Sequence, residues 1–221
     1  MAQIICLANS RKHGNRCIAG IDLADGRLVR PVSSLYDGAI TVDMQRVEGE
    51  IPQVLDVLEI SLRDNGPDYG FQPENRFLGN EKWKRTGCVA PEDILKYCES
   101  GPTILHNALD RVPWKHLQRL PRSQWKSLQF VRVMDARFHK TPSAKGVLQV
   151  RAQFSYGGSG YDLVVTDSLA EQAVRTSRSI GADCALLISL GGPFPEDNPD
   201  PQCYKLVAGV IEIGARSDRL R

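Results

Sequence analysis

The sequence lacks any apolar run long enough to cross a membrane, and its apolar stretches have the length of single strands. A spanning helix takes roughly 20 consecutive apolar residues. The opening MAQIICLANSRK shows neither the basic start nor the apolar stretch of a secretory signal. We therefore expect a cytoplasmic protein that has no membrane among its partners.

The motifs of the common enzyme classes are also missing. No GxxxxGK[ST] phosphate loop is present, no GxGxxG follows a strand, and no GxSxG marks a nucleophile elbow. The four histidines are isolated from one another, and a lone surface histidine is usually only solvated. The sequence therefore predicts no catalytic residues and no cofactor.

Cysteine occurs six times, but never as a CxxC pair or at the spacing of a zinc site. Four of the six lie in or beside apolar strand patterns, where a free thiol packs as a small hydrophobic group. These are Cys6, Cys17, Cys184 and Cys203. We expect buried free thiols and no metal site.

The excess of one sign of charge is small overall, because 28 basic and 26 acidic residues leave a net charge of +2. The distribution is uneven, since residues 76–151 hold 15 basic and 6 acidic residues, whereas the segments on either side are acidic. A concentrated positive field attracts phosphates. A solvated surface of Lys and Arg covering apolar stems is the alternative, and the composition leaves both open.

The sequence is rich in short strand patterns separated by turn residues. They fall at 3–10, 16–23, 27–34, 54–62 and 81–90, and again at 127–138, 147–156, 161–166, 184–190 and 203–213. Helix signals occur at 91–100 and 168–180, and short helical pieces are expected within 103–126, around PRSQWKS. Strand series with little helix favour two small barrels, because a parallel doubly wound sheet needs alternating crossover helices.

We therefore predict a mainly β fold, a β-rich α+β chain in which two small β-barrels are joined by a helical, basic connecting region. The expected domains are 1–90 for the first barrel, 91–126 for the connector and 127–221 for the second barrel. Both halves run strand, strand, strand, connection, strand, although no exact repeat is visible.

Small barrels bind single-stranded nucleic acid in a groove where Lys and Arg follow the phosphates and aromatic rings stack on bases. The candidates for such contacts are Arg11, Lys12, Arg16, Arg30, Lys82, Trp83, Lys84 and Arg85, with Arg132, Arg137, Arg151, Tyr156 and Tyr161 in the second half. Each has an ordinary alternative. Trp83 can be a core residue between surface lysines, and the two tyrosines can be cross-strand partners.

The turn at 10–16, SRKHGNR, carries more cations than a hairpin requires. A glycine and an asparagine already supply the positive φ of a tight turn, so Arg11, Lys12 and Arg16 are surplus to it. They either form a solvated tip or grip an anion. Strand pairing is expected to bring one of these arginines near Arg30, where like charges repel unless an acid or a phosphate lies between them.

Several ordered blocks resemble the bacterial dual OB-containing domain family. They are LANSRKHGNRCIAG, GRLVRPVS, LDVLEISL, FQPENRF, YDLVVTDS, ALLISLG and CYKLVAGVI, and they span Leu7 to Ile211. The resemblance implies two OB-like small β-barrels, nucleic-acid binding and a place in a bacterial defence or conflict system, and it supplies no catalytic residues. Phe71 departs from the pattern, because a polar residue such as His is expected there.

The resemblance covers Gln72, Glu74 and Asn75 of the QPEN block. We expect this block either to hold an anion or to pin a long loop onto the barrel, with Glu74 neutralising the nearby arginines. The main functional prediction is a non-enzymatic binder of single-stranded DNA or RNA. The alternatives are a protein-interaction or sensor module with a partner from the same bacterial system, and a nucleotide-binding enzyme. Base preference and oligomeric state stay open.

Overall fold

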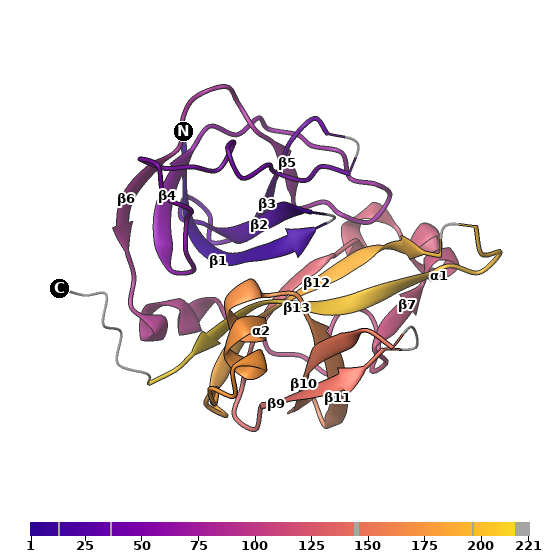
Figure 1. The fold of residues 1–221 in the computed structure, drawn as a ribbon. Helices are drawn as coiled ribbons and strands as arrows, with labels where there is room; N and C mark the ends of the chain where they lie inside the picture. Colours follow the sequence, from indigo (N-terminus) through magenta and orange to yellow (C-terminus); the bar gives the residue numbers. More distant parts are fainter. Residues whose placement is uncertain (13, 36, 144–145, 196, 215–221) are drawn as a thin grey trace.

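The computed structural model describes residues 1–12, 14–35, 37–143, 146–195 and 197–214. With 47% strand and 12% helix it is mainly β, as predicted, and its strands form two sheets (Figure 1). We call residues 2–88, which contain the first sheet, the first lobe, and residues 111–212, which contain the second sheet, the second lobe.

The first lobe is a strand meander that curls on itself. Its strands are β1 (Ala2–Lys12), β2 (Asn15–Asp22), β3 (Leu28–Val32), β4 (Asp56–Ile60), β5 (Asn75–Phe77) and β6 (Lys84–Cys88), in the spatial order β5-β3-β2-β1-β4-β6. Only β3 and β5 run parallel. An isolated bridge between Leu62 and Leu78 joins the chain after β4 to the chain after β5. The sheet is thus curled without being a closed barrel. The strands β1 to β5 follow the five-stranded arrangement of an OB fold, and β6 extends the sheet beside β4.

The second lobe repeats this arrangement. Its strands are β7 (Arg111–Pro113), β8 (Leu128–Val133), β9 (Arg137–Pro142), β10 (Leu148–Tyr156), β11 (Ser159–Val165), β12 (Cys184–Phe194) and β13 (Gln202–Glu212), in the order β8-β12-β13-β11-β10-β9 with β7 beside β13. The edge strands β8 and β9 are consecutive in the chain and act as two halves of one broken strand. Again one pair is parallel, β11 with β13. The helix α2 (Ser168–Arg175) connects β11 to β12.

Three local expectations differ from the structure. The predicted helix at 91–100 is a 3-10 helix, η1 (Pro91–Tyr97), followed along the chain by α1 (Trp114–Arg119) and η2 (Arg122–Gln124). The segment 91–126, expected to be a helical connector, contributes β7 to the second sheet. The strand expected at 127–138 divides into β8 and β9, because the chain bends at Met134 and Asp135, two consecutive exposed residues.

The two lobes share a core, and this explains why several strands are apolar on both faces. On β1, Ile4 and Cys6 point into the first lobe, whereas the alternate residues point toward the second lobe. On β12, Leu186 and Ile188 fill the second lobe, and their neighbours face the first. The core between the lobes consists of Ile5, Leu7, Ala8, Ala19, Ile21, Ile94, Leu128, Phe130, Ala185, Leu187, Ala208 and Ile211. Burial on both faces gives the continuous apolar runs of the sequence.

The strands of the two sheets approach closely where β1 and β2 face β12 and β13 (Figure 1). Gly209 on β13 marks the tightest point, because a Cβ built there would lie 2.0 Å from the carbonyl oxygen of Leu7. Only glycine allows such an approach of two backbones. The two lobes are therefore packed against each other over strand faces rather than joined by a loose linker.

Candidate nucleic-acid interface

The cations of the opening hairpin bind the second lobe. Arg11 forms an ion pair with Glu171 of α2. Arg16 donates from Nη1 to the hydroxyl of Ser168 at 2.8 Å and to the carbonyl oxygen of Asn9 at 3.5 Å. The side chain of Lys12 lies outside what the structure describes. The surplus charge of this turn therefore fastens the hairpin to the start of α2.

Arg30 is buried, which corrects its expected role as a phosphate contact. Only 4% of the residue is exposed. Its Nη1 donates to Oδ1 of Asn75 at 2.8 Å and to the hydroxyl of Ser127 at 3.1 Å, and its Nη2 donates to the hydroxyl of Ser189 at 3.2 Å. The guanidinium joins β3 of the first lobe to residues beside and on the second sheet, and no strand of nucleic acid can reach it.

The QPEN block pins its loop onto the second lobe. The carboxylate of Glu74 accepts hydrogen bonds from the backbone N–H of Ser127 at 2.8 Å, from its hydroxyl at 2.7 Å and from the N–H of Leu128 at 3.0 Å. Asn75 donates to Oε1 of Gln72 at 3.0 Å. The three polar residues of the block thus hold the loop in place, and the carboxylate of Glu74 supports this alternative rather than an anion site.

Phe71, the departure from the family pattern, has a structural role. The ring is 1% exposed and meets the ring of Trp114 edge-on, with the ring centres 5.5 Å apart. Edge-to-face contacts of this kind stabilise aromatic pairs beyond their buried area. An apolar ring therefore suits position 71 in this chain, because the neighbour on α1 is an indole.

The run 82–85 does not form a stacking platform. Trp83 is 6% exposed and packs in the core of the first lobe with Ile4 and Leu58, so its expected role in base stacking is corrected to a core role. Lys84 pairs with Glu59 at 3.4 Å. Three of the four side chains remain at the surface, and these include Arg85, which pairs with Glu50 and Asp56 at 3.1 Å each.

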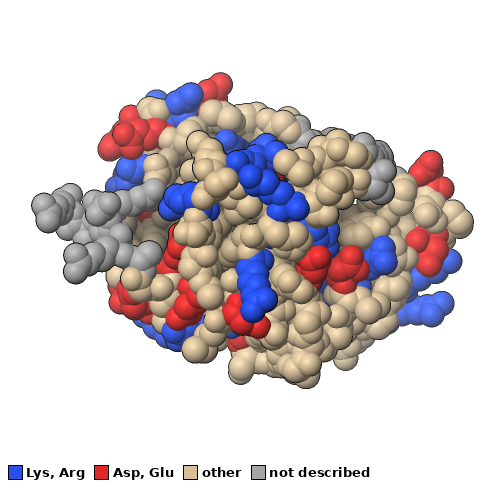
Figure 2. All heavy atoms as spheres, turned by 60° about the horizontal axis from the view of Figure 1, so that its bottom comes forward, with Lys and Arg blue, Asp and Glu red and all other residues tan. Residues whose placement is uncertain are grey.

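The cations predicted in the second half also have acidic neighbours. Arg132 holds Asp183 with two hydrogen bonds of 3.0 and 2.8 Å, and these bonds lower the pKa of that carboxyl. Arg151 pairs with Asp162 at 3.0 Å. The hydroxyl of Tyr156 donates to the carbonyl oxygen of Glu99, and burial raises the pKa of that phenol. Figure 2 accordingly shows separate blue patches, several of them beside red ones, and no continuous basic band.

An OB fold binds oligonucleotides across its second and third strands, and only one of the two such faces is open here. In the first lobe those strands are β2 and β3, and their outer residues Ala19, Ile21 and Leu28 are covered by the second lobe. In the second lobe they are β10 and β11. Their outer face carries Arg151, and Gln153 lies between Arg137 of β9 and Asp162 of β11. The second lobe therefore presents the free face.

A basic groove adjoins this face, between β9 and the turn that follows α2. We call it the β9 groove, and it encloses about 560 Å³. Its lining consists of Ala136, Arg137, Phe138, His139, Lys140, Val174, Ser177, Arg178, Ser179 and Ile180. Three permanent cations and one imidazole thus meet in a lining without Asp or Glu. Sequence reasoning noted only Arg137 among them, although two further basic residues lie within RFHKTP of β9.

The cations of the β9 groove are weakly engaged inside the molecule. Lys140 donates to the carbonyl oxygen of Arg175 at 3.1 Å. Arg178 approaches Glu212 at 3.8 Å. The side chain of Arg137 makes no hydrogen bond or ion pair with the described residues. The pKa of the Asp135 carboxyl is lowered by hydrogen bonds from Ser155 and further by the charge of Arg137. His139 lies 3.8 Å from Asp162. Their charges therefore remain available to an anion, in contrast to Arg132 or Arg85.

Two further features concern the described residues as a whole. No helix within them is both long and apolar enough to cross a membrane. Nor do three side chains of His, Cys, Asp or Glu gather there in the way a metal centre requires.

The strand order of the two lobes defines a protein built from two OB-type units, in which the β2–β3 face of the first lobe is covered by the second lobe. A family model described as a dual OB-containing domain matches residues 2–210, and the chain belongs to that family. No curated protein and no solved structure matches it. The family resemblance noted in the sequence is thereby confirmed.

Proposed function

We propose that the protein binds single-stranded DNA or RNA without catalysis, and that the strand lies across β9, β10 and β11 with its phosphates in the β9 groove. The observation that carries the proposal is the meeting of Arg137, Lys140 and Arg178 in a lining without carboxylates, beside the uncovered OB face. OB folds use this face for oligonucleotides, and Lys and Arg along it follow the phosphates. A role in a bacterial defence system rests on the family resemblance.

Salt dependence of binding tests the proposal. A labelled oligonucleotide of about 12 nucleotides, DNA or RNA, matches the site size of one OB fold. With about four phosphate contacts the logarithm of the binding constant should fall against the logarithm of salt concentration with a slope of about −3. Fluorescence anisotropy measures this slope, and a flat response or no binding at low salt contradicts the proposal.

Matched triple variants locate the site. Arg137→Ala/Lys140→Ala/Arg178→Ala should weaken binding at least about tenfold and reduce the slope by about 2, because three phosphate contacts disappear. The control, Arg27→Ala/Lys82→Ala/Lys84→Ala, removes the same charge from exposed positions of the first lobe. It should bind within about twofold of the parent. The reverse ranking would move the interface to the first lobe.

A role as a protein-interaction module is the second candidate, and one observation favours it. In the first lobe the face of β2 and β3 already binds protein, because the second lobe covers it. The open face of the second lobe could hold a partner in the same way. A stable complex with a neighbouring gene product that survives nuclease treatment, together with no oligonucleotide binding, would support this function instead.

A further inference from the structure

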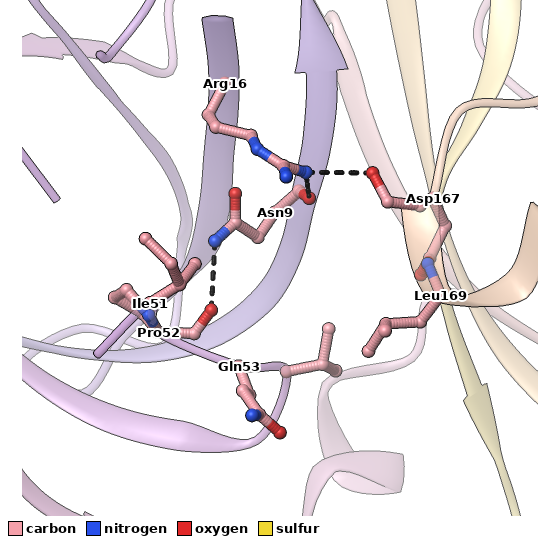
Figure 3. Close-up of a pocket in the computed structure, with 9 residues that line it drawn as sticks. Asn9, Arg16, Ile51, Pro52, Gln53, Asp167 and Leu169 are labelled. Atoms are coloured by element: carbon pink, nitrogen blue, oxygen red, sulfur yellow. Dashed lines mark hydrogen bonds between the residues drawn. The ribbon is translucent and has the colours of Figure 1, made fainter. Parts of the chain in front are cut away.

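A small pocket lies at the seam of the two lobes, away from the β9 groove (Figure 3). It encloses about 230 Å³ and is lined by Asn9, Arg16, Ile51, Pro52, Gln53, Val54, Asp167, Ser168 and Leu169. In Figure 3, Ile51, Pro52 and Gln53 lie on one side and Leu169 on the other, with Arg16 at one end. Both lobes therefore contribute walls to one cavity.

Four of the nine residues that line this seam pocket are apolar, and one of the four is an exposed leucine. Leu169 is 54% exposed in the first turn of α2. Ile51 and Pro52 lie opposite it in Figure 3, and Val54 also belongs to the lining. Pockets for drug-sized ligands enclose roughly 300–1,000 Å³. The smaller volume of the seam pocket suits a ligand whose apolar part is about one aromatic ring.

Arg16 supplies a cation without a described ion-pair partner at one end of the pocket. Its guanidinium is half-buried, its described hydrogen bonds go to neutral oxygens of Ser168 and Asn9, and no carboxylate of the described residues pairs with it. A partly buried charge is costly unless it is paired. Arginine binds carboxylates and phosphates well, because its planar fork donates two parallel hydrogen bonds.

The acids near Arg16 are already engaged. Both oxygens of Asp167 accept backbone hydrogen bonds, from Leu169 and Ala170 on one oxygen and from Val210 on the other, at 2.9–3.0 Å. Glu171 pairs with Arg11 and, at 3.7 Å, with Arg175. These contacts hold both carboxylates in place, so that the guanidinium of Arg16 has no described carboxylate partner.

From these contacts we infer that the seam pocket binds a small organic anion with a flat apolar body, whose carboxylate or phosphate meets Arg16. The body lies between Leu169 and the segment 51–54, so that the ligand touches both lobes. This site is separate from the β9 groove, and the inference does not rest on the proposed nucleic-acid binding.

Three one-ring probes test the inference on the full chain: benzoate, phenyl phosphate and the neutral benzamide. Amide shifts in two-dimensional NMR should change at Gln53, Ser168 and Leu169, with dissociation constants in the millimolar range for so few atoms. Benzoate and phenyl phosphate show which anion is preferred. Benzamide should bind at least about tenfold more weakly, because its carbonyl oxygen can accept only a neutral hydrogen bond and carries no charge to pair with the guanidinium.

Two variants fix the location and the role of charge. Leu169→Trp should fill the pocket and abolish anion binding, whereas Leu148→Trp, an exposed leucine on β10, should leave it unchanged. Arg16→Gln should weaken the anions at least about tenfold and leave benzamide unaffected. The inference is overturned if neither anion shifts these amides at tens of millimolar, if benzamide binds equally well, or if Leu169→Trp binds as the parent does. Oligonucleotide binding should be the same in Leu169→Trp, so the two sites are tested independently.

Discussion

At the scale of the residue, Arg30 illustrates how a side chain that looks like an anion ligand can be structural. Its guanidinium meets three side-chain oxygens, from Asn75, Ser127 and Ser189. Arg30→Ala would leave those buried groups with fewer partners, and we expect a loss of about 2–4 kcal/mol in the free energy of unfolding. Chemical denaturation measures it.

The same experiment has a matched control. The side chain of Arg27 is 85% exposed, and it pairs with Asp25 only at 3.7 Å. Arg27→Ala should therefore change stability by no more than about 0.5 kcal/mol. If Arg30→Ala were as mild as this control, the guanidinium would not hold the lobes together.

Lys205 also carries a buried charge, and this charge predicts a pH dependence of stability. It is 1% exposed, and its ammonium donates to the carbonyl oxygens of Ile104 at 2.5 Å and Asn107 at 2.6 Å and to Oδ1 of Asn107 at 2.9 Å. Burial lowers its pKa to about 8, and the charge of Asp110 opposes this in part. Above that pH the unfolded chain holds more protons than the folded one, so stability rises with pH.

Lys205→Met removes this contribution and isolates it. The stability advantage of the parent over the variant should increase by about 1 kcal/mol between pH 7.5 and pH 9, and stay constant below that window. Burial raises the pKa of the thiols of Cys6, Cys184 and Cys203 to about 12. These thiols destabilise the parent and the variant alike above pH 9, so only the difference is diagnostic. A difference that is flat across the window would place the folded pKa of Lys205 near its ordinary value.

At the scale of the element, the contact of β13 with β1 depends on one glycine. A Cβ at Gly209 would lie 2.0 Å from the Leu7 oxygen and 3.2 Å from the Ala8 Cβ. Gly209→Ala should cost about 3 kcal/mol, since both strands would have to shift. Gly192→Ala is the control on β12, because nothing lies within 4 Å of the added carbon. Thermal unfolding of the two variants should differ clearly, and equal midpoints would show that the strands can separate freely.

Most strands could be predicted from the sequence because apolar runs and turn residues are local signals. The strands β5 and β7, of three residues each, are too short for an alternation to show. Nor does alternation reveal that the two faces of β1 fill different cores. A tryptophan between lysines, such as Trp83, is equally compatible with base stacking and with a core position. Only the tertiary packing of its side chain distinguishes the two.

The site was less predictable than the fold, because charge pairing acts over long sequence distances. Arg11 pairs with Glu171, 160 positions away in the sequence, and Arg30 donates a hydrogen bond to Ser189, 159 positions away. A count of basic residues cannot show such neutralisation. The β9 groove likewise joins Lys140 to Arg178, which the chain separates by α2 and several strands. Of the residues that line it, only Arg137 was a candidate from the sequence.

At the scale of the whole molecule, the shared core makes the two lobes one cooperative unit. Leu7 and Ile21 of the first lobe pack with Phe130 and Leu187 of the second, so unfolding of either lobe would expose apolar surface of the other. The cost is roughly 25 cal/mol per Å² of apolar surface. An intermediate with one folded lobe is therefore disfavoured.

A mutation in one lobe, read from a reporter in the other, tests this cooperativity. In the Trp114→Phe/Trp125→Phe protein, Trp83 is the remaining tryptophan of the three, and its fluorescence reports the first lobe. Val150→Ala, which removes two methyl groups from the core of the second lobe, should destabilise by about 2 kcal/mol. We expect the Trp83 transition in urea to shift with the circular-dichroism transition of the whole chain, since coincident transitions are the mark of two-state unfolding. A Trp83 midpoint that stays in place while the circular dichroism splits into two steps would mean that the lobes fold independently, and that the ties of Arg30, Glu74 and Gly209 do not couple them.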